Sequence, residues 1–320
     1  MPEAPDTTAT TKGDDAGKTP DGVLVAEAGP PPGKPRSLWS DAWHDLIRKP
    51  KFVIPAFIIL FLLFVAAFPS VFTSETPRIG DLANHHLQKP ELTHFFSPEW
   101  FGYDQQGRSI YARVVYGTRA SVTIGICVTA LVLVAGSLIG MLAGYFGGWV
   151  DAVLSRVTDT FMGIPFMLGA MVVLVSFNAR TQWVVILALA FLGWTTVARV
   201  MRGSVISIKQ ADYVQAARSL GAGTTRILLR HILPNAAAPV IVVAMVALGG
   251  YITAEATLSF LGIGLSDPAI SWGGDINTGR NSIRVAEHVL IFPSIALSVT
   301  ILSFLMLGDA VRDALDPKLR

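Results

Sequence analysis

The sequence has few charged residues and a single cysteine. Asp, Glu, Lys and Arg make up 15% of its 320 residues, whereas hydrophobic residues make up 52%. This balance excludes an ordinary water-soluble domain and predicts an integral membrane protein, because too few charges remain to cover a water-facing surface. The net charge of +2, without a cluster of basic and aromatic residues, excludes a nucleic-acid partner. Since Cys127 is alone, neither an intramolecular disulfide nor a cysteine-based metal site can form.

The first 35 residues lack the large apolar side chains that could form a core. They are rich in Pro, Gly, Thr, Asp and Ala, and we expect residues 1–35 to be a disordered tail. The tail contains Gly13-Asp-Asp-Ala-Gly-Lys-Thr19, but three residues separate its glycines where a phosphate-binding loop has four. HExxH and GxSxG patterns and paired catalytic carboxylates are also missing. The sequence therefore predicts no nucleotide site, no catalytic residue, no cofactor site and no metal site in this chain.

Long apolar runs are what the sequence has instead. A helix needs about 20 uncharged residues to cross ~30 Å of hydrocarbon. Six windows meet this requirement: residues 52–72, a window within 120–150, and residues 160–179, 181–198, 232–254 and 289–308. Arg180 separates the third window from the fourth, which predicts a tight helical hairpin, since one continuous helix would overshoot the bilayer. The predicted fold class is all-α, a polytopic membrane protein with six transmembrane helices.

The distribution of Lys and Arg predicts the orientation of these helices. If both termini are cytoplasmic, that side holds 17 of the 25 Lys and Arg residues and the other side holds eight. Arg48, Lys49 and Lys51 directly precede the first span, where basic residues favour the cytoplasmic side most strongly. We therefore expect both termini in the cytoplasm, with residues 73–119 and 263–288 outside it.

The long outer loop carries His85, His86 and His94, which could indicate a metal site. The sequence shows neither a periodic pattern of ligands nor a carboxylate cluster at ligand spacing around them. We interpret them as solvated loop histidines.

Residues 199–231, between the fourth and fifth spans, carry too many charges to cross the membrane. Good helix formers follow Asp212, Arg218 lies near the expected C-terminal end, and Gly221 provides a stop. Thr224 or Thr225 can cap a second short helix, which we expect Pro234 to end before the fifth span.

The first of these helices has an apolar, small-sided face. Its members are Val214, Ala217, Leu220 and Gly221. Such a face suits insertion into a groove on another protein, because Ala and Gly permit close backbone approach. Packing of the helix on the subunit itself explains the same periodicity equally well, and both interpretations stay open at this point.

The same segment resembles the Glu-Ala-Ala loop of binding-protein-dependent ABC importer permeases. The resemblance rests on Gln215-Ala216-Ala217, Gly221 and Leu233-Pro234, with Gln215 standing where the family usually has Glu. His231-Ile-Leu-Pro-Asn235 is similar to the dipeptide and oligopeptide branch. Five further stretches from that branch occur in the expected order: FGYDQQGR (101–108), GYFGGWVD (144–151), EATLSFLG (255–262), SWGG (271–274) and the segment from Gly308-Asp309 to Leu315-Asp-Pro317. Together they look like the C-type permease subunit of dipeptide and oligopeptide importers.

The resemblance implies a function, a set of partners and a set of coupling residues. In that family the loop is a coupling helix that docks on a cytoplasmic ATPase, so the residues expected to contact it are Asp212, Tyr213, Val214, Gln215, Ala216, Ala217, Leu220, Gly221, Leu233 and Pro234. The implied partners are a second permease, two ATPase subunits that bind ATP and Mg, an extracytoplasmic peptide-binding protein and the peptide substrate. The implied location is the bacterial inner membrane. Closure of the ATPases would drive alternating access through the connection from Ala217 to Pro234 and the fifth span.

The implied domain layout has a type I importer core. It consists of a disordered cytoplasmic tail (1–35), an N-terminal segment with the first span (36–72), an extracytoplasmic loop (73–119), a five-helix permease core (120–309) with the coupling loop at 199–235, and a cytoplasmic C-terminal tail (310–320).

Glu255, near the outer end of the fifth span, is a candidate for the substrate path. A charged carboxylate in a membrane span is costly, so we expect it to face protein or water. One interpretation is an outer-gate residue that contacts the partner permease or the amino terminus of the peptide. The other is a solvated helix end that ties down the loop at 263–288, through Arg280 or Arg284.

Two alternative functions remain at this stage. Nickel and glutathione importers of the same family have closely similar permeases. An ion-coupled secondary transporter would need intramembrane carboxylates and paired broken helices, and only Glu255 is near such a position.

Overall fold

The computed structural model describes residues 46–177, 180–266 and 268–315. The predicted disordered tail, residues 1–35, and the end of the C-terminal tail lie outside these residues. Within them the fold is helical, and the only extended pairing is an isolated bridge between Tyr103 and Ser109. The predicted all-α class is confirmed.

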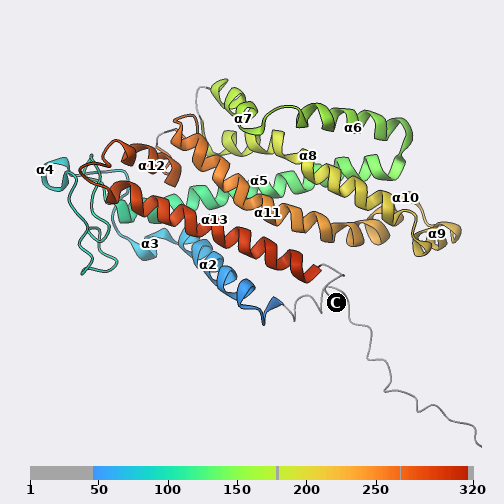
Figure 1. Ribbon diagram of the computed structural model, residues 1–320, viewed down its shortest axis with the longest axis horizontal. Coiled ribbons are helices and arrows are strands. Elements are labelled where there is room, and N and C mark those ends of the chain that lie inside the picture. Colours follow the sequence, from blue (N-terminus) through green and yellow to red (C-terminus); the bar gives the residue numbers. More distant parts are fainter. Residues whose placement is uncertain (1–45, 178–179, 267, 316–320) are drawn as a thin grey trace, which may run out of the picture. The chain divides into compact units, whose positions relative to one another are not determined.

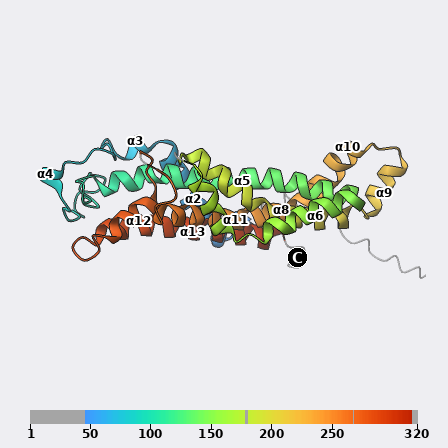
Figure 2. The same cartoon turned by 90° about the horizontal axis from the view of Figure 1, so that it is seen from above.

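The long helices form one bundle (Figures 1 and 2). They are α2 (Pro50–Ala67), α5 (Ile110–Phe146), α8 (Gln182–Ile208), α11 (Leu233–Phe260) and α13 (His288–Leu315). Shorter elements connect them: α3 (Pro69–Phe72), α4 (Leu82–His85), α6 (Gly148–Met162), α7 (Phe166–Val175), α9 (Asp212–Ser219), α10 (Thr224–Arg226), the π-helix η1 (Ile227–Ile232) and α12 (Trp272–Arg280). The α4 and α12 helices lie at one end of the bundle, and α9 and α10 lie at the other (Figure 1).

Five of these helices are long and apolar enough to cross a membrane. They are Pro50–Ala67, Ile110–Phe146, Gln182–Ile208, Thr224–Phe260 and His288–Leu315. A sixth span exists if the bent pair α6 and α7 is counted as one. The described residues thus match the predicted multi-pass architecture.

The predicted third span, residues 160–179, is wrong as a single straight helix. The chain bends by 83° between α6 and α7. Pro165 causes the break, because proline lacks an N–H for the helix ladder and disfavours a helical conformation at the preceding residue, Ile164. The remaining α7 has only 10 residues and cannot cross a ~30 Å core alone.

Pro234 does not end a helix, contrary to prediction. The chain runs from α10 through the six residues of η1 directly into α11, where Pro234 occupies the first turn. In a regular α-helix the proline ring would clash with the carbonyl four residues earlier, and the wider π-turn relieves this contact. The coupling segment and the fifth span are therefore continuous.

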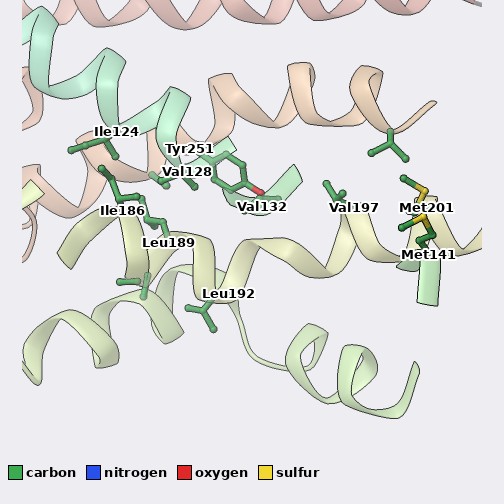
Figure 3. Packing of buried hydrophobic residues seen from close by; sticks show 14 of the residues in the cluster. Ile124, Val128, Val132, Met141, Ile186, Leu189, Leu192, Val197, Met201 and Tyr251 are labelled. Atoms are coloured by element: carbon green, nitrogen blue, oxygen red, sulfur yellow. The ribbon is translucent and has the colours of Figure 1, made fainter. Parts of the chain in front are cut away.

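The α5 and α8 helices share the main core. Figure 3 shows Ile124, Val128 and Val132 of α5 facing Ile186 and Leu189 of α8. Farther along, the helix backbones approach directly, because Gly136, Gly140 and Gly144 of α5 lie against the carbonyls of Trp194, Ala198 and Arg202 of α8. Glycines spaced by four on one helix face allow this close packing, which substitutes in lipid for a hydrophobic driving force.

Candidate functional site

The α9 segment is built from local signals. Asp212 lies in the first turn of α9 and Arg218 in its last turn, each at the end where the helix dipole favours its charge. Gly221 follows with φ +81°, a left-handed conformation that glycine adopts without strain. The predicted helix and its stop are confirmed. The structure places this helix at the end of the bundle opposite α12 (Figures 1 and 2).

An exposed surface of the α9 segment combines apolar and basic side chains. Leu220 is 89% exposed, Leu229 is 55% exposed and Tyr213 is 46% exposed. Three arginines of the same segment are also exposed: Arg218, Arg226 and Arg230. The segment thus leaves large apolar side chains exposed among basic ones, which is compatible with the predicted docking role.

The predicted apolar face is not a single surface. Val214 is fully buried and belongs to the same core cluster as Ile227 and Ile232. Its assignment to the docking face with Leu220 is therefore wrong, because a side chain enclosed by its own subunit cannot meet a partner. Val214 instead fixes α9 to the bundle, so packing on the subunit itself holds for this residue, and docking on another protein stays a prediction for the exposed residues.

The other predicted coupling residues remain accessible. Exposed members are Asp212, Tyr213, Gln215, Ala216, Leu220, Gly221 and Pro234, whereas Ala217 and Leu233 are half-buried. Gln215, in place of the family's usual Glu, donates from Nε2 to the carbonyl of Lys209 at 3.1 Å. Its side chain thus ties α9 to the end of α8.

Glu255 is enclosed at the opposite end of the bundle. Its side chain has no exposed surface, and its carboxylate accepts hydrogen bonds from Ser121 Oγ of α5 at 3.0 Å and Ser259 Oγ at 2.8 Å. The Ser271 side chain, at the start of α12, is a third hydrogen-bond partner. Glu255 therefore joins α11, α5 and α12.

The interpretation of Glu255 as a solvated helix end is wrong. Among the described residues neither Arg280 nor Arg284 pairs with it, and the Arg280 guanidinium instead lies 5.6 Å from the centre of the Phe260 ring. The sequence held one clue, since Ser259 follows by four residues and shares a helix face with Glu255. Ser121 of α5 is 134 residues away and could not be predicted, whereas the contact with Ser271 agrees with the expected tie to the loop at 263–288.

Two further contacts fasten α12 to α5 beside this acid. Trp272 is fully buried and donates from Nε1 to the carbonyl of Val114 at 3.0 Å. Arg113 donates from Nε to Asp275 at 2.8 Å and from Nη1 to the carbonyl of Pro77 at 3.0 Å. The segment after α11 is thus held firmly in place.

A polar cleft between α5, α6 and α8 was not predicted. Its volume is about 410 Å³, and its charged lining residues are Asp159, Arg199 and Arg202. Arg202 binds Asp151 of α6 through two nitrogens, the Nη2 contact being 2.7 Å, and Arg199 binds Asp159 at 2.9 Å. Each arginine of the cleft therefore has an acidic partner, although Asp151 lies outside the lining.

The three loop histidines do not share one site. His85 stacks on Tyr103 with ring centres 4.3 Å apart, and His86 Nδ1 lies 3.0 Å from the carbonyl of Gln105. His94 lies between Glu91 and Glu99, with ligand atoms of all three within 4.8 Å of one another. Glu91 and Glu99 lie three residues before and five residues after His94 in the sequence, so the prediction that no carboxylate cluster lies near the histidines is wrong at His94. The side chains of Glu91, His94 and Glu99 are all at least partly exposed.

Comparisons with known families bear on the whole chain. The family described as "Binding-protein-dependent transport system inner membrane component" matches residues 136–320. A second family, "N-terminal TM domain of oligopeptide transport permease C", matches residues 37–90. The two matches together cover the α8 to α11 segment and the first membrane helix.

Curated relatives are similar over almost the full length. The chain is 35% identical to the glutathione transport system permease protein GsiD of Pectobacterium atrosepticum, over 89% of this chain and 93% of that one. It is 33% identical to the dipeptide transport system permease protein DppC of Alkalihalophilus pseudofirmus, over 93% and 97%. It is 35% identical to DppC of Bacillus subtilis, over 89% and 87%.

Solved structures with similar helices include two transporters. An amino acid ABC transporter with histidines aligns with 62% of this chain and 91% of its own, at 16% identity and a TM-score of 0.47. The inward-facing methionine ABC transporter MetNI aligns with 63% and 96%, at 17% identity and a TM-score of 0.47.

Proposed function

Because this chain belongs to the family of binding-protein-dependent transport system inner membrane components, we propose that it is a permease subunit that imports short peptides. Members of this family are transport permeases, and the chain has the several membrane helices of a multi-pass protein. The peptide substrate, the partner subunits and the orientation in the membrane are the parts that we propose.

The exposed surface of α9 carries the proposal. Leu220, 89% exposed between arginines at the end of the bundle, is a large apolar side chain that a partner protein would remove from water. We propose that an ATPase subunit covers it and delivers the energy of ATP and Mg, which this chain has no motif to bind. This arrangement places α9 in the cytoplasm, in agreement with the excess of Lys and Arg on that side.

A peptide substrate is supported by the names of the relatives, since those at 33% to 35% identity are named dipeptide and glutathione permeases. We propose a second permease and an extracytoplasmic peptide-binding protein as the remaining partners.

Glutathione is the second candidate substrate. It is favoured by the full-length similarity to a permease named for glutathione transport. Nickel has no comparable support, since the relatives reported above are named for dipeptides or glutathione.

Uptake by the assembled transporter tests the proposal. The chain, co-expressed with its adjacent permease, ATPases and binding protein, is reconstituted in vesicles and supplied with labelled dipeptide, pentapeptide, glutathione or Ni²⁺. We expect ATP-dependent uptake of a peptide and co-purification of the ATPase. Uptake driven by an ion gradient without ATP would overturn the proposal, and saturable uptake of Ni²⁺ alone would replace the substrate class.

A further inference from the structure

Lys209 caps the C-terminal end of α5. It directly follows α8, and its Nζ donates to the carbonyls of Gly144 at 3.1 Å and Tyr145 at 3.0 Å, both in the last turn of α5. The last four carbonyls of a helix have no partner within it and lie at the negative end of its dipole. The Lys209 ammonium group, which has three N–H donors, satisfies two of these carbonyls at once.

The backbone of the same residue holds α9. The carbonyl of Lys209 accepts the hydrogen bond from Gln215 Nε2. Lys209 therefore contacts α5 through its side chain, continues α8 through its backbone and binds α9 through its carbonyl. Two residues later the chain enters α9 at Ala211, the N-terminal boundary of that helix.

The opposite connection from α9 has a different character. It reaches α11 through η1, six residues with the wider turns of a π-helix. Val214 of α9 lies in one core cluster with Ile227 and Ile232 of η1, so α9 is held on this side as well. On the Lys209 side, the contacts of α9 lead to α5 and α8, whose backbones already touch along Gly136, Gly140 and Gly144.

We infer that Lys209 is a positioning residue that fastens α9 to the α5 and α8 pair, so that a displacement of α9 moves both helices together. This inference rests on the proposed docking of an ATPase at α9. It adds α5 and α8 to the fifth span, α11, which the sequence favoured, as helices that follow the movement of α9. The glycine contacts extend along the pair, so the two helices are closely packed beyond the point where Lys209 joins them.

Replacement of Lys209 in the assembled transporter tests this inference. Lys209→Met keeps the apolar stem and removes the ammonium, whereas Lys209→Arg keeps a cation near the two carbonyls. Lys51→Met, at an exposed position in the first turn of α2, is the matched control. The readouts, normalised to the amount of assembled complex, are the peptide transported and the ATP hydrolysed.

We expect Lys209→Met to bind the ATPase but to raise the ATP hydrolysed per peptide by about tenfold, within the range of coupling between two sites. Lys209→Arg recovers most of the coupling, and Lys51→Met resembles wild type. A lower yield of complex with an unchanged ratio would show a structural role only and overturn the inference. An unchanged yield and ratio would overturn it as well. Failure of the wild-type complex to bind ATPase or transport peptide would instead contradict the proposed function.

Discussion

Gly140 of α5 lies directly against the backbone carbonyl of Ala198 in α8, and a side-chain carbon at position 140 would also come within 2.8 Å of Met201 Cβ. Gly203, on α8, has nothing within 4 Å of the corresponding point. The two glycines thus differ in their surroundings, although both lie in long helices. The contact at Gly140 sets the distance between α5 and α8.

Gly140→Ala should destabilise the protein by about 1–3 kcal/mol, because the added methyl overpacks a backbone contact. Gly203→Ala is the matched control and should be neutral or stabilising by up to ~1 kcal/mol, since alanine favours a helix more than glycine. Thermal unfolding of the purified chain in detergent, followed by circular dichroism, measures both. Equal stability of the two variants would contradict the glycine contact.

The ATPase-docking proposal predicts a loss of binding at Leu220. Leu220→Asp places a charge in the apolar part of the interface and should weaken ATPase binding by at least ~2 kcal/mol, the loss typical of an interface anchor. Ala217→Glu should have the same direction of effect. Leu82→Asp, 58% exposed at the other end of the bundle, is the control. Co-purification of the ATPase with each variant is the measurement, and full retention by Leu220→Asp would refute the surface.

Helix α9 could be predicted from the sequence because its signals are local. Asp212, Arg218 and Gly221 each act within one turn, and the structure has the helix between them. The inward side of α9 could not be assigned, because the burial of Val214 depends on Ile227 and Ile232. Periodicity locates an apolar face but does not say which protein covers it.

The errors along the spans have equally specific causes. Pro165 itself was the signal for the break between α6 and α7, but the apolar residues on both sides of it favoured one continuous span. At Pro234 the local rule predicted a helix end, and a π-turn accommodated the ring instead. The glycines at 136, 140 and 144 also have a readable spacing, and their partner helix became apparent only in the structure.

Glu255 predicts a stability difference between two substitutions. Glu255→Ala leaves the hydroxyls of Ser121 and Ser259 buried without their acceptor and opens a cavity, at a cost of about 2–5 kcal/mol. Glu255→Gln keeps the shape and one acceptor oxygen, and should cost less than half as much. Thermal unfolding measures both variants.

Uptake by the same two variants separates anchoring from gating. If Glu255 only joins α11, α5 and α12, Glu255→Gln transports peptide at the wild-type rate per assembled complex. A large loss of uptake in Glu255→Gln, with assembly and ATP hydrolysis intact, would instead support the outer-gate role that the sequence raised.

Tyr103 predicts a loss of stability in alkali. Burial, with smaller contributions from the charges of Glu75 and Glu99, raises the pKa of Tyr103 to about 12 from its usual 10.0. Its contribution to stability is therefore complete below pH ~10 and is lost as the pH rises from ~10 to ~12, because the unfolded chain releases the proton first. Tyr103→Phe should flatten this part of the stability curve. Unfolding temperatures of both proteins from pH 8 to 11 provide the test, and parallel curves would contradict it.

The proposed orientation predicts which loops are accessible from outside the cell. Leu92, 61% exposed in the loop before α5, should lie outside, and Thr225 of α10, exposed at the α9 end, should lie in the cytoplasm. We place one cysteine at either position in a Cys127→Ser background and treat sealed right-side-out vesicles with a membrane-impermeant maleimide. Leu92→Cys should react at once, and Thr225→Cys only after detergent opens the vesicles. The Lys and Arg excess and the proposed ATPase docking both require α9 to lie in the cytoplasm. The reverse labelling would contradict the orientation and the docking proposal together, because Leu220 would then face away from a cytoplasmic ATPase.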